Sequence, residues 1–233
     1  MLKKTVADLH PYVPEEPLQD LQAKLGIDKL VRLSANENPF GTSTRVKKAL
    51  ATATSLPLNE YPDGNANALR EAVAQYLQVD PEQLLFGCGL DEIIELITRT
   101  FLEPGDEVVE PWPTFSEYKL HDQIEAAKTV DVPVKEDGSV DADGLVAAIT
   151  DKTKLLWLCN PNNPTGTLMQ PAEMQALLSR IPQHVLVLID EAYIEFVDGV
   201  DNPSAVQFLD QFPNIVVMRT FSKIYGLAGM RVG

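Results

Sequence analysis

The sequence predicts an α/β fold, a mostly parallel sheet with helices on both of its faces. Three observations support this prediction. Short apolar runs, typical of buried parallel strands, alternate with longer segments of helical periodicity. Hydrophobic residues make up 45% of the chain, which is enough to bury a sizeable core. Polar clusters follow most of the apolar runs directly, as expected where the strand ends of a parallel sheet form a ligand crevice.

Residues 1–44 are expected to form an N-terminal arm, and residues 45–233 one large domain. Prolines interrupt regular structure in the arm and leave one short helical stretch at Leu18–Leu25. These prolines are Pro11, Pro14, Pro17 and Pro39.

Within the large domain, strand-like and helix-like segments follow one another, which is the pattern of parallel sheets with crossover helices. The predicted strands are Leu84–Cys88, Glu107–Glu110, Leu155–Cys159, Val185–Ile189 and Ile215–Met218. The predicted helices are Ala68–Leu77, Asp91–Leu102, Ala172–Arg180 and Ser204–Phe212.

The composition argues against several classes of protein. A net charge of −15 would repel nucleic acid and anionic membrane surfaces. The two cysteines, Cys88 and Cys159, form no C-x-x-C pair, and no Cys/His cluster suggests a metal site. The longest apolar run is too short to span a bilayer, and the N-terminus does not read as a secretory signal. We therefore expect a cytoplasmic protein with reduced thiols and no bound metal.

The polar clusters should meet in one crevice, because the carboxyl ends of parallel strands lie at one edge of the sheet. They are Gly87–Glu92, Asn160–Gly166, Asp190–Tyr193 and Arg219–Lys223. Asp190 would be partly desolvated and needs a cation or strong donors. A Walker-type magnesium site would need a Gly-Lys phosphate loop, which is absent, and a Rossmann fingerprint is absent because Glu92 stands where its third glycine belongs. An organic cation or a structural partner remains for Asp190.

Lys223 follows the last apolar run and is either a solvated surface lysine or a partly desolvated amine. Desolvation favours the neutral, nucleophilic form of a lysine. Thr220 and Ser222 add hydroxyl groups, and Arg231 lies beyond a glycine-containing loop. Because arginine binds phosphate in bidentate fashion, these residues favour the functional interpretation.

These motifs resemble a known family. Ser222-Lys223, followed by Gly226-Leu-Ala-Gly-Met-Arg231, resembles the lysine motif of the class II aminotransferases of fold type I, which use pyridoxal 5′-phosphate (PLP). Asn160–Gly166 and Asp190–Tyr193 resemble two further motifs of that family, in the same order. Other segments are similar to its histidinol-phosphate aminotransferase branch, namely Leu33–Gly41, Asn59–Asp63 and Gly87–Glu92.

The resemblance implies a role for each residue near the cofactor ring. Lys223 would carry PLP as a Schiff base and later move the substrate proton. Asp190 would pair with the protonated pyridine nitrogen. Tyr193 and Asn163 would donate hydrogen bonds to the phenolic oxygen of the ring. Phe115 would stack on the ring face, unless it is only a core residue.

The resemblance also implies a site for the cofactor phosphate. Backbone N–H groups of Gly89, Leu90 and Asp91 would bind it at a helix N-terminus. Side chains would complete the site, and one of them would come from the neighbouring subunit of a homodimer. These side chains are Thr220, Ser222, Arg231 and, from the neighbour, Tyr61.

The expected activity is transamination of L-histidinol phosphate with 2-oxoglutarate by a ping-pong mechanism, with Tyr12 and Asn36 of the arm as candidates for substrate contact. Alternatives within the family are an aromatic amino acid aminotransferase and a threonine-phosphate decarboxylase. Outside it, the alternatives are a non-catalytic PLP-binding fragment and the sensor half of a transcription regulator. The proline-rich arm, with few basic residues, argues against the regulator.

Members of the family continue past the lysine motif into a smaller C-terminal domain. We therefore expect a C-terminally truncated chain that lacks this domain. The resemblance further implies that a seventh strand is cut at its start, which would leave an exposed sheet edge.

Overall fold

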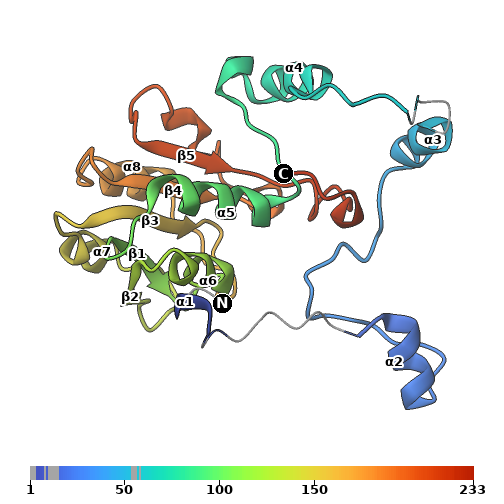
Figure 1. Ribbon diagram of the computed structural model, residues 1–233, viewed down its shortest axis with the longest axis horizontal. Coiled ribbons are helices and arrows are strands. Elements are labelled where there is room, and N and C mark those ends of the chain that lie inside the picture. Colours follow the sequence, from blue (N-terminus) through green and yellow to red (C-terminus); the bar gives the residue numbers. More distant parts are fainter. Residues whose placement is uncertain (1–3, 8, 10–15, 54–56, 58) are drawn as a thin grey trace.

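The fold is built on a five-stranded parallel sheet with the strand order β2-β1-β3-β4-β5 (Figure 1). The computed structural model describes residues 4–7, 9, 16–53, 57 and 59–233. The strands are β1 (Glu107–Trp112), β2 (Lys128–Pro133), β3 (Thr153–Cys159), β4 (Leu186–Asp190) and β5 (Ile215–Met218). The predicted α/β class is confirmed.

Helices cover both faces of the sheet, as the sequence predicted. The pleat of β3 shows why. Leu156 and Leu158 pack on one side against α7 and α8, whereas Leu155 and Trp157 pack on the other side against α5 and α6. The covering helices are α5 (Leu90–Phe101), α6 (Ser116–Ile124), α7 (Ala142–Ala148) and α8 (Pro171–Leu178). The carboxyl edge of the sheet stays open between these two layers.

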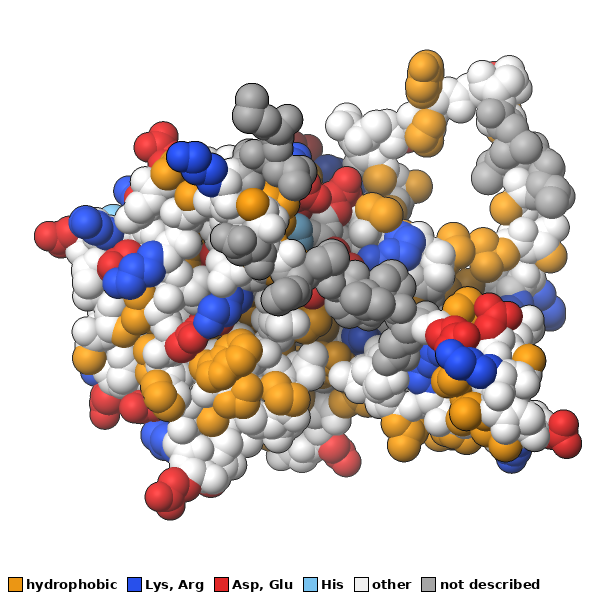
Figure 2. All heavy atoms as spheres, turned by 60° about the horizontal axis from the view of Figure 1, so that its bottom comes forward, with side chains coloured by type: hydrophobic (Ala, Val, Ile, Leu, Met, Phe, Trp, Pro, Cys, Tyr) orange, Lys and Arg blue, Asp and Glu red, His pale blue; other side chains and the backbone are white. Residues whose placement is uncertain are grey.

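The remaining helices lie outside this core. They are α1 (Lys4–Ala7), α2 (Leu18–Leu25), α3 (Thr44–Thr52) and α4 (Asn67–Leu77), with 3-10 turns at Pro81–Gln83, Ile194–Phe196, Ala205–Phe208 and Ala228–Met230. α1, α2 and α3 contain no buried residue. Figure 2 shows the α2 region as a lobe beside the sheet body, with hydrophobic side chains on its surface. The division at residue 44 stays a prediction.

One predicted strand is wrong and one strand was missed. Leu84–Cys88 is not a strand: Gly87 exchanges two backbone hydrogen bonds with Gly233 and accepts a third from Gly89, and Leu85 is 67% exposed. A groove separates the segment from β5, so its backbone joins no ladder of the sheet. β2 was missed because Lys128, Thr129 and Asp131 break its apolar pattern at the edge of the sheet.

The predicted helix Ser204–Phe212 is also wrong over most of its length. Only the 3-10 turn Ala205–Phe208 forms, and it begins where Ser204 Oγ accepts a hydrogen bond from the backbone N–H of Val206. Buried Glu191 accepts hydrogen bonds from the N–H of Ala205 and the hydroxyl of Ser204. These tertiary bonds fix the turn and replace the continuing helix.

Neither a membrane span nor a metal site is found in the described part of the chain. No helix there combines the length and hydropathy needed to cross a bilayer. No three or more His, Cys, Asp or Glu side chains within the described ranges are grouped so that they could hold a metal ion.

Candidate active site

Several of the predicted site residues lie at the carboxyl edge of β3, β4 and β5. Asp190 is the last residue of β4, and the strand register pairs it with Cys159 on one side and Met218 on the other. The loop 160–166 therefore begins beside Asp190, and the segment leading to Lys223 begins on its other side. Parallel pairing fixes this arrangement through the backbone ladder.

Asp190 is almost fully buried, with 3% of its surface exposed. Its Oδ2 accepts a hydrogen bond from the hydroxyl of Tyr118 at 2.5 Å, and its Oδ1 accepts one from the N–H of Ala192 at 2.9 Å. Burial raises the pKa of Asp190, whereas these two bonds and the positive charge of Lys223 lower it. A buried carboxylate of this kind suits a cationic ligand group.

Lys223 is half-buried and lies in the same electrostatic environment. Its Nζ donates to the carbonyl oxygen of Ala35 at 3.3 Å and lies 5.6 Å from the ring centroid of Tyr193. Burial lowers the pKa of Lys223, and the nearby carboxylates of Asp91 and Asp190 partly oppose this effect. The geometry therefore favours the partly desolvated amine over the solvated surface lysine.

The arm reaches this part of the site. Asn36 donates from Nδ2 to the hydroxyl oxygen of Tyr193 at 3.1 Å. Asn38 donates from Nδ2 to the carbonyl of Ile224 at 2.8 Å. Residues 35–38 thus lie over the lysine segment, which places Asn36 beside two of the predicted catalytic residues. Tyr12, the other residue predicted from the arm, lies outside the described residues.

The start of α5 offers a place for an anion. Gly89 is the N-cap residue with φ +78°, a backbone conformation that favours glycine, and a Cβ there would come within 2.5 Å of an Arg231 nitrogen and displace that side chain. The helix dipole and the free N–H groups of the first turn favour negative charge. Arg231 lies at the same point, where it donates to Asp91 at 3.1 Å and to the carbonyl of Cys88 at 3.4 Å.

Two buried hydroxyl groups lie at the end of β5. Thr220 Oγ1 donates to Ser222 Oγ at 3.0 Å and also accepts a hydrogen bond from the N–H of Ser222. Thr220 Oγ1 approaches the carbonyl of Val232, just after Arg231, at 3.4 Å. The hydroxyl pair and Arg231 therefore lie on neighbouring stretches of chain, in keeping with the predicted anion site.

Asn163 and Phe115 lie in the loops beside these strand ends. Asn163 is partly buried in the loop 160–166. Phe115 precedes α6 and meets the ring of Tyr118 edge-on, with centroids 5.4 Å apart. Tyr61 is fully exposed, and its predicted role in a neighbouring subunit stays a prediction.

Sequence reasoning missed two residues that shape the site. Tyr118 holds Asp190, but a tyrosine on an amphipathic helix looks like an ordinary core residue. Asn162 is buried, accepts from Thr114 Oγ1 at 2.8 Å and donates to the carbonyl of Pro113 at 3.0 Å. It ties the loop after β3 to the loop after β1, and its place between two prolines of the motif was the available signal.

The site therefore combines a half-buried amine, a buried carboxylate and a glycine-capped helix N-terminus beside Arg231. The sequence profile of the family "Aminotransferase class I and II" matches residues 28–233.

The chain belongs to this family.

Similar aminotransferases support the assignment in sequence and in structure. The chain is 50% identical to the histidinol-phosphate aminotransferase of Lactiplantibacillus plantarum over 232 residues, all of this chain and 65% of that protein. It superimposes with a TM-score of 0.87 on the Sinorhizobium meliloti histidinol-phosphate aminotransferase in complex with pyridoxal 5′-phosphate, at 30% identity. That alignment covers 99% of this chain and 61% of the other. An aromatic aminotransferase from Pyrococcus horikoshii gives 0.79 at 26% identity, covering 93% of this chain and 61% of the other.

These aminotransferases are longer than this chain, which spans about 61–65% of their length. The parallel sheet and its covering helices correspond to the large domain of fold-type I aminotransferases.

Proposed function

We propose that this chain is the cofactor-binding part of a histidinol-phosphate aminotransferase, with pyridoxal 5′-phosphate bound at Lys223. One observation carries the proposal: a half-buried Lys223 shares its surroundings with the buried carboxylate of Asp190. The chain in which this occurs is 50% identical to a curated histidinol-phosphate aminotransferase.

The residues present fit each part of this cofactor. The N-terminus of α5 and the hydroxyls of Thr220 and Ser222 suit its phosphate. Arg231 suits it as well, because a guanidinium has five N–H donors and three contacts are already made within the chain. Asp190 suits a protonated ring nitrogen. Tyr193 and Asn163 would donate to the phenolic oxygen, and Phe115 would cover a ring face.

The cofactor supplies an aldehyde and an electron-withdrawing ring. The chain supplies the rest of the chemistry. Lys223 Nζ would bond to the aldehyde, since burial favours its neutral, nucleophilic form. After the substrate amine has displaced it, the same nitrogen would carry the substrate Cα proton. Asp190 would hold the ring nitrogen protonated. A placed base of this kind typically contributes about 10²–10⁴-fold to rate.

We further propose L-histidinol phosphate as amino donor and 2-oxoglutarate as acceptor, used in turn at one site. The support is the name shared by the similar proteins, together with Asn36 of the arm lying against Tyr193. Aromatic amino acids are a second group of amino donors to be tested, because the chain is also similar in structure to an aromatic aminotransferase.

A homodimer is part of the proposal, with Tyr61 reaching the phosphate site of the neighbour. The side chain of Tyr61 is fully exposed, and the arm carries two further exposed apolar residues, Leu33 and Phe40. Mixing Tyr61→Ala and Lys223→Ala subunits would test this role. A hybrid dimer should regain one intact site and part of the activity, and no regain would argue against sharing.

The cofactor assignment is tested by trapping. The chain is incubated with pyridoxal 5′-phosphate, reduced with borohydride and digested, and the labelled peptide is identified by mass spectrometry. The label is expected on Lys223. It should be absent from Lys223→Ala and present in Lys152→Ala, an exposed control. A label that persists without Lys223 would falsify the assignment.

The substrate assignment is tested separately, with a panel of donors. Glutamate formation from 2-oxoglutarate is measured with L-histidinol phosphate and with aromatic amino acids, and carbon dioxide release with O-phosphothreonine. The highest kcat/KM is expected for L-histidinol phosphate. A clear preference for another donor would replace the substrate and leave the cofactor site standing.

A further inference from the structure

Tyr118 connects a covering helix to the buried carboxylate of the site. It belongs to α6, is completely buried, and donates from Oη to Asp190 Oδ2 at 2.5 Å. The opposite carboxylate oxygen accepts the N–H of Ala192 at 2.9 Å. Two donors on different elements therefore fix the plane of the Asp190 carboxylate.

The ring of Tyr118 is itself locked in place. It stacks on Trp157 of β3 with centroids 4.6 Å apart and an interplanar angle of 4°, and Phe115 meets it edge-on. Trp157 Nε1 donates to Asp122 Oδ1 at 3.3 Å, and Asp122 lies one turn beyond Tyr118 on α6. The helix thus holds both rings, and the hydroxyl of Tyr118 has one placement at Asp190.

The charges determine which group donates. Burial raises the pKa of Tyr118 well above its usual range, so the phenol keeps its proton and is the donor. Burial also raises the pKa of Asp190, and the bond from Tyr118 lowers it. Three further titratable groups influence this carboxyl: Lys223 after β5, Asp91 on α5 and Cys159 on β3. Removing the phenol would therefore favour the protonated, uncharged form of Asp190.

We propose that Tyr118 is a positioning residue that holds Asp190 as an oriented carboxylate for the ring nitrogen of the bound cofactor. This inference rests on the proposed function, because it assumes that the ring binds at Asp190. It adds to that function a residue that would not contact the cofactor nitrogen itself.

The test uses Tyr118→Phe, which keeps the stacked ring and removes only the hydroxyl. The probe is pyridoxamine 5′-phosphate, which has no aldehyde and so measures ring binding without the bond to Lys223. Its dissociation constant is measured by fluorescence titration. Binding is expected to weaken about ten-fold or more, the usual effect of losing a hydrogen bond to a charged group. Circular dichroism checks that the variant is folded.

Two further measurements distinguish positioning from general damage. In an Asp190→Asn background, Tyr118→Phe should change affinity less than two-fold, because the carboxylate on which it acts is gone. With Asp190 present, Tyr118→Phe should lose cofactor binding at a higher pH than the unaltered chain does. The reason is that the Asp190 carboxyl is protonated more easily once it has lost the hydrogen bond from Tyr118. If binding to the Asn background is too weak to measure, this pH shift decides.

The outcomes separate the inference from the proposed function. Equal affinity of Tyr118→Phe and the unaltered chain, or equal losses in both backgrounds, would overturn the role of Tyr118 and leave the cofactor site intact. An unchanged pH profile would overturn it as well. If the unaltered chain binds neither pyridoxamine nor pyridoxal 5′-phosphate, the proposed function is wrong and the inference is wrong with it.

Discussion

At the scale of single residues, several carboxyl groups are buried, and they differ in whether a hydrogen-bond donor reaches them. Asp122 and Asp190 have hydrogen-bond donors that offset part of their desolvation. Glu110 on β1 does not, because in the described structure neither of its carboxylate oxygens has a hydrogen-bond partner. Since an unpaired buried charge is costly, Glu110 should be protonated in the folded state.

Glu110 therefore makes stability depend on pH. Burial, followed by the charges of Asp122 on α6 and Asp131 on β2, raises its pKa to about 9, and Lys119 on α6 opposes this. The folded state binds the Glu110 proton more tightly than the unfolded state does, because the pKa is higher in the folded state. This preference adds fully to the free energy of unfolding below the unfolded pKa, near 4.5, and is lost as the pH rises towards the folded pKa, about 9. Stability should thus fall between these limits.

Glu110→Gln should be more stable than the unaltered chain by at most roughly 5 kcal/mol near pH 8, because the amide does not ionise and each pH unit above 4.5 costs the carboxyl about 1.4 kcal/mol. Urea unfolding at several pH values measures the effect. The two chains should differ little near pH 4, which serves as the internal control. A difference that stays constant across the pH range would show that Glu110 does not titrate as described.

Sequence reasoning identified residues that carry chemistry and missed those that act through geometry. Asp190 is recognisable because a charged group directly after an apolar run is unusual, and Lys223 because it lies in a polar cluster just beyond the next one. Tyr118 and Asn162 are not, since their importance depends on which loops and helices meet at the sheet edge. The predicted role of Tyr61 involves a second chain, which neither the sequence nor the fold of one chain describes.

At the scale of elements, two short contacts hold the arm to the lysine segment. Thr42 Oγ1 donates to the carbonyl of Tyr225 at 2.8 Å, next to the bond from Asn38 to Ile224. Gly226 lies against Gly41, and a Cβ on Gly226 would overlap the carbonyl oxygen of Gly41. The arm therefore lies against the lysine segment because residue 226 has no side chain.

Gly226→Ala should release the arm and make it several-fold more sensitive to limited proteolysis. Gly199→Ala is the matched control, because Gly199 has a similar φ of +71°, against +65° for Gly226, but nothing within 4 Å of its added Cβ. Cleavage sites are mapped by mass spectrometry. Equal protection of the arm in both variants would mean that this contact does not hold it.

A second glycine can be tested in the same way at the N-terminus of α5, where the cofactor phosphate is proposed to bind. Gly89→Ala would strain a left-handed residue by about 1–2 kcal/mol and push Arg231 away. Affinity for pyridoxal 5′-phosphate should fall about ten-fold. Gly105→Ala, at φ +97° with free space around it, should lose stability without this loss of affinity. A matching loss in both variants would point to general destabilisation instead.

Elements were predicted well where one physical signal dominated. β3, β4 and β5 each contain an uninterrupted apolar run, because helices cover both faces of the sheet there. β2 lies at the sheet edge and tolerates charged residues, so its sequence looks like a loop. Leu84–Cys88 has the composition of a strand, but whether it joins a ladder depends on a neighbour that local sequence does not specify.

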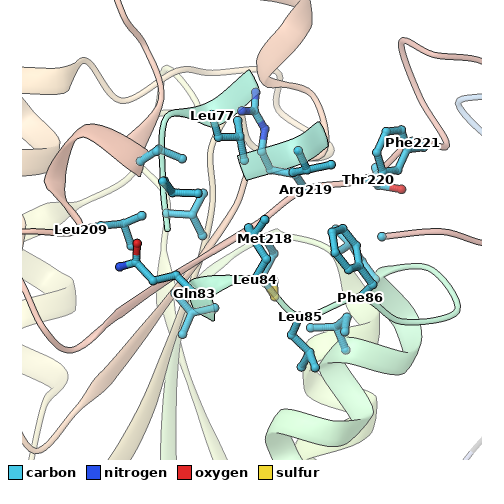
Figure 3. Close-up of a pocket in the computed structure, with 18 of the residues that line it drawn as sticks. Leu77, Gln83, Leu84, Leu85, Phe86, Leu209, Met218, Arg219, Thr220 and Phe221 are labelled. Carbon is cyan, nitrogen blue, oxygen red and sulfur yellow. The ribbon is translucent and has the colours of Figure 1, made fainter. Parts of the chain in front are cut away.

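At the scale of the whole molecule, an apolar groove of about 760 Å³ runs beside β5. Figure 3 shows Leu84, Leu85 and Phe86 on one side of it, with Met218 of β5 close by. Within the described ranges β5 pairs only with β4, so its other edge joins no further strand there. Open edges and apolar patches promote association.

The groove should bind the dye 1-anilinonaphthalene-8-sulfonate and increase its fluorescence. Leu85→Gln should reduce the signal, because Leu85 lines the groove and is 67% exposed. Leu33→Gln, at 85% exposure on the arm, is the matched control and should leave the signal nearly unchanged. Equal effects of both variants would mean that the dye binds elsewhere.

The backbone ladder between β4 and β5 sets Asp190 opposite Met218, five residues before Lys223. The interval between carboxylate and amine is therefore fixed by main-chain pairing, and the connecting stretch around Asp198–Asn202, which is largely exposed, has no part in it. Evolution or an engineer could lengthen that stretch, or insert a reporter domain there, and the Asp190 carboxylate and the Lys223 amine would keep their spacing.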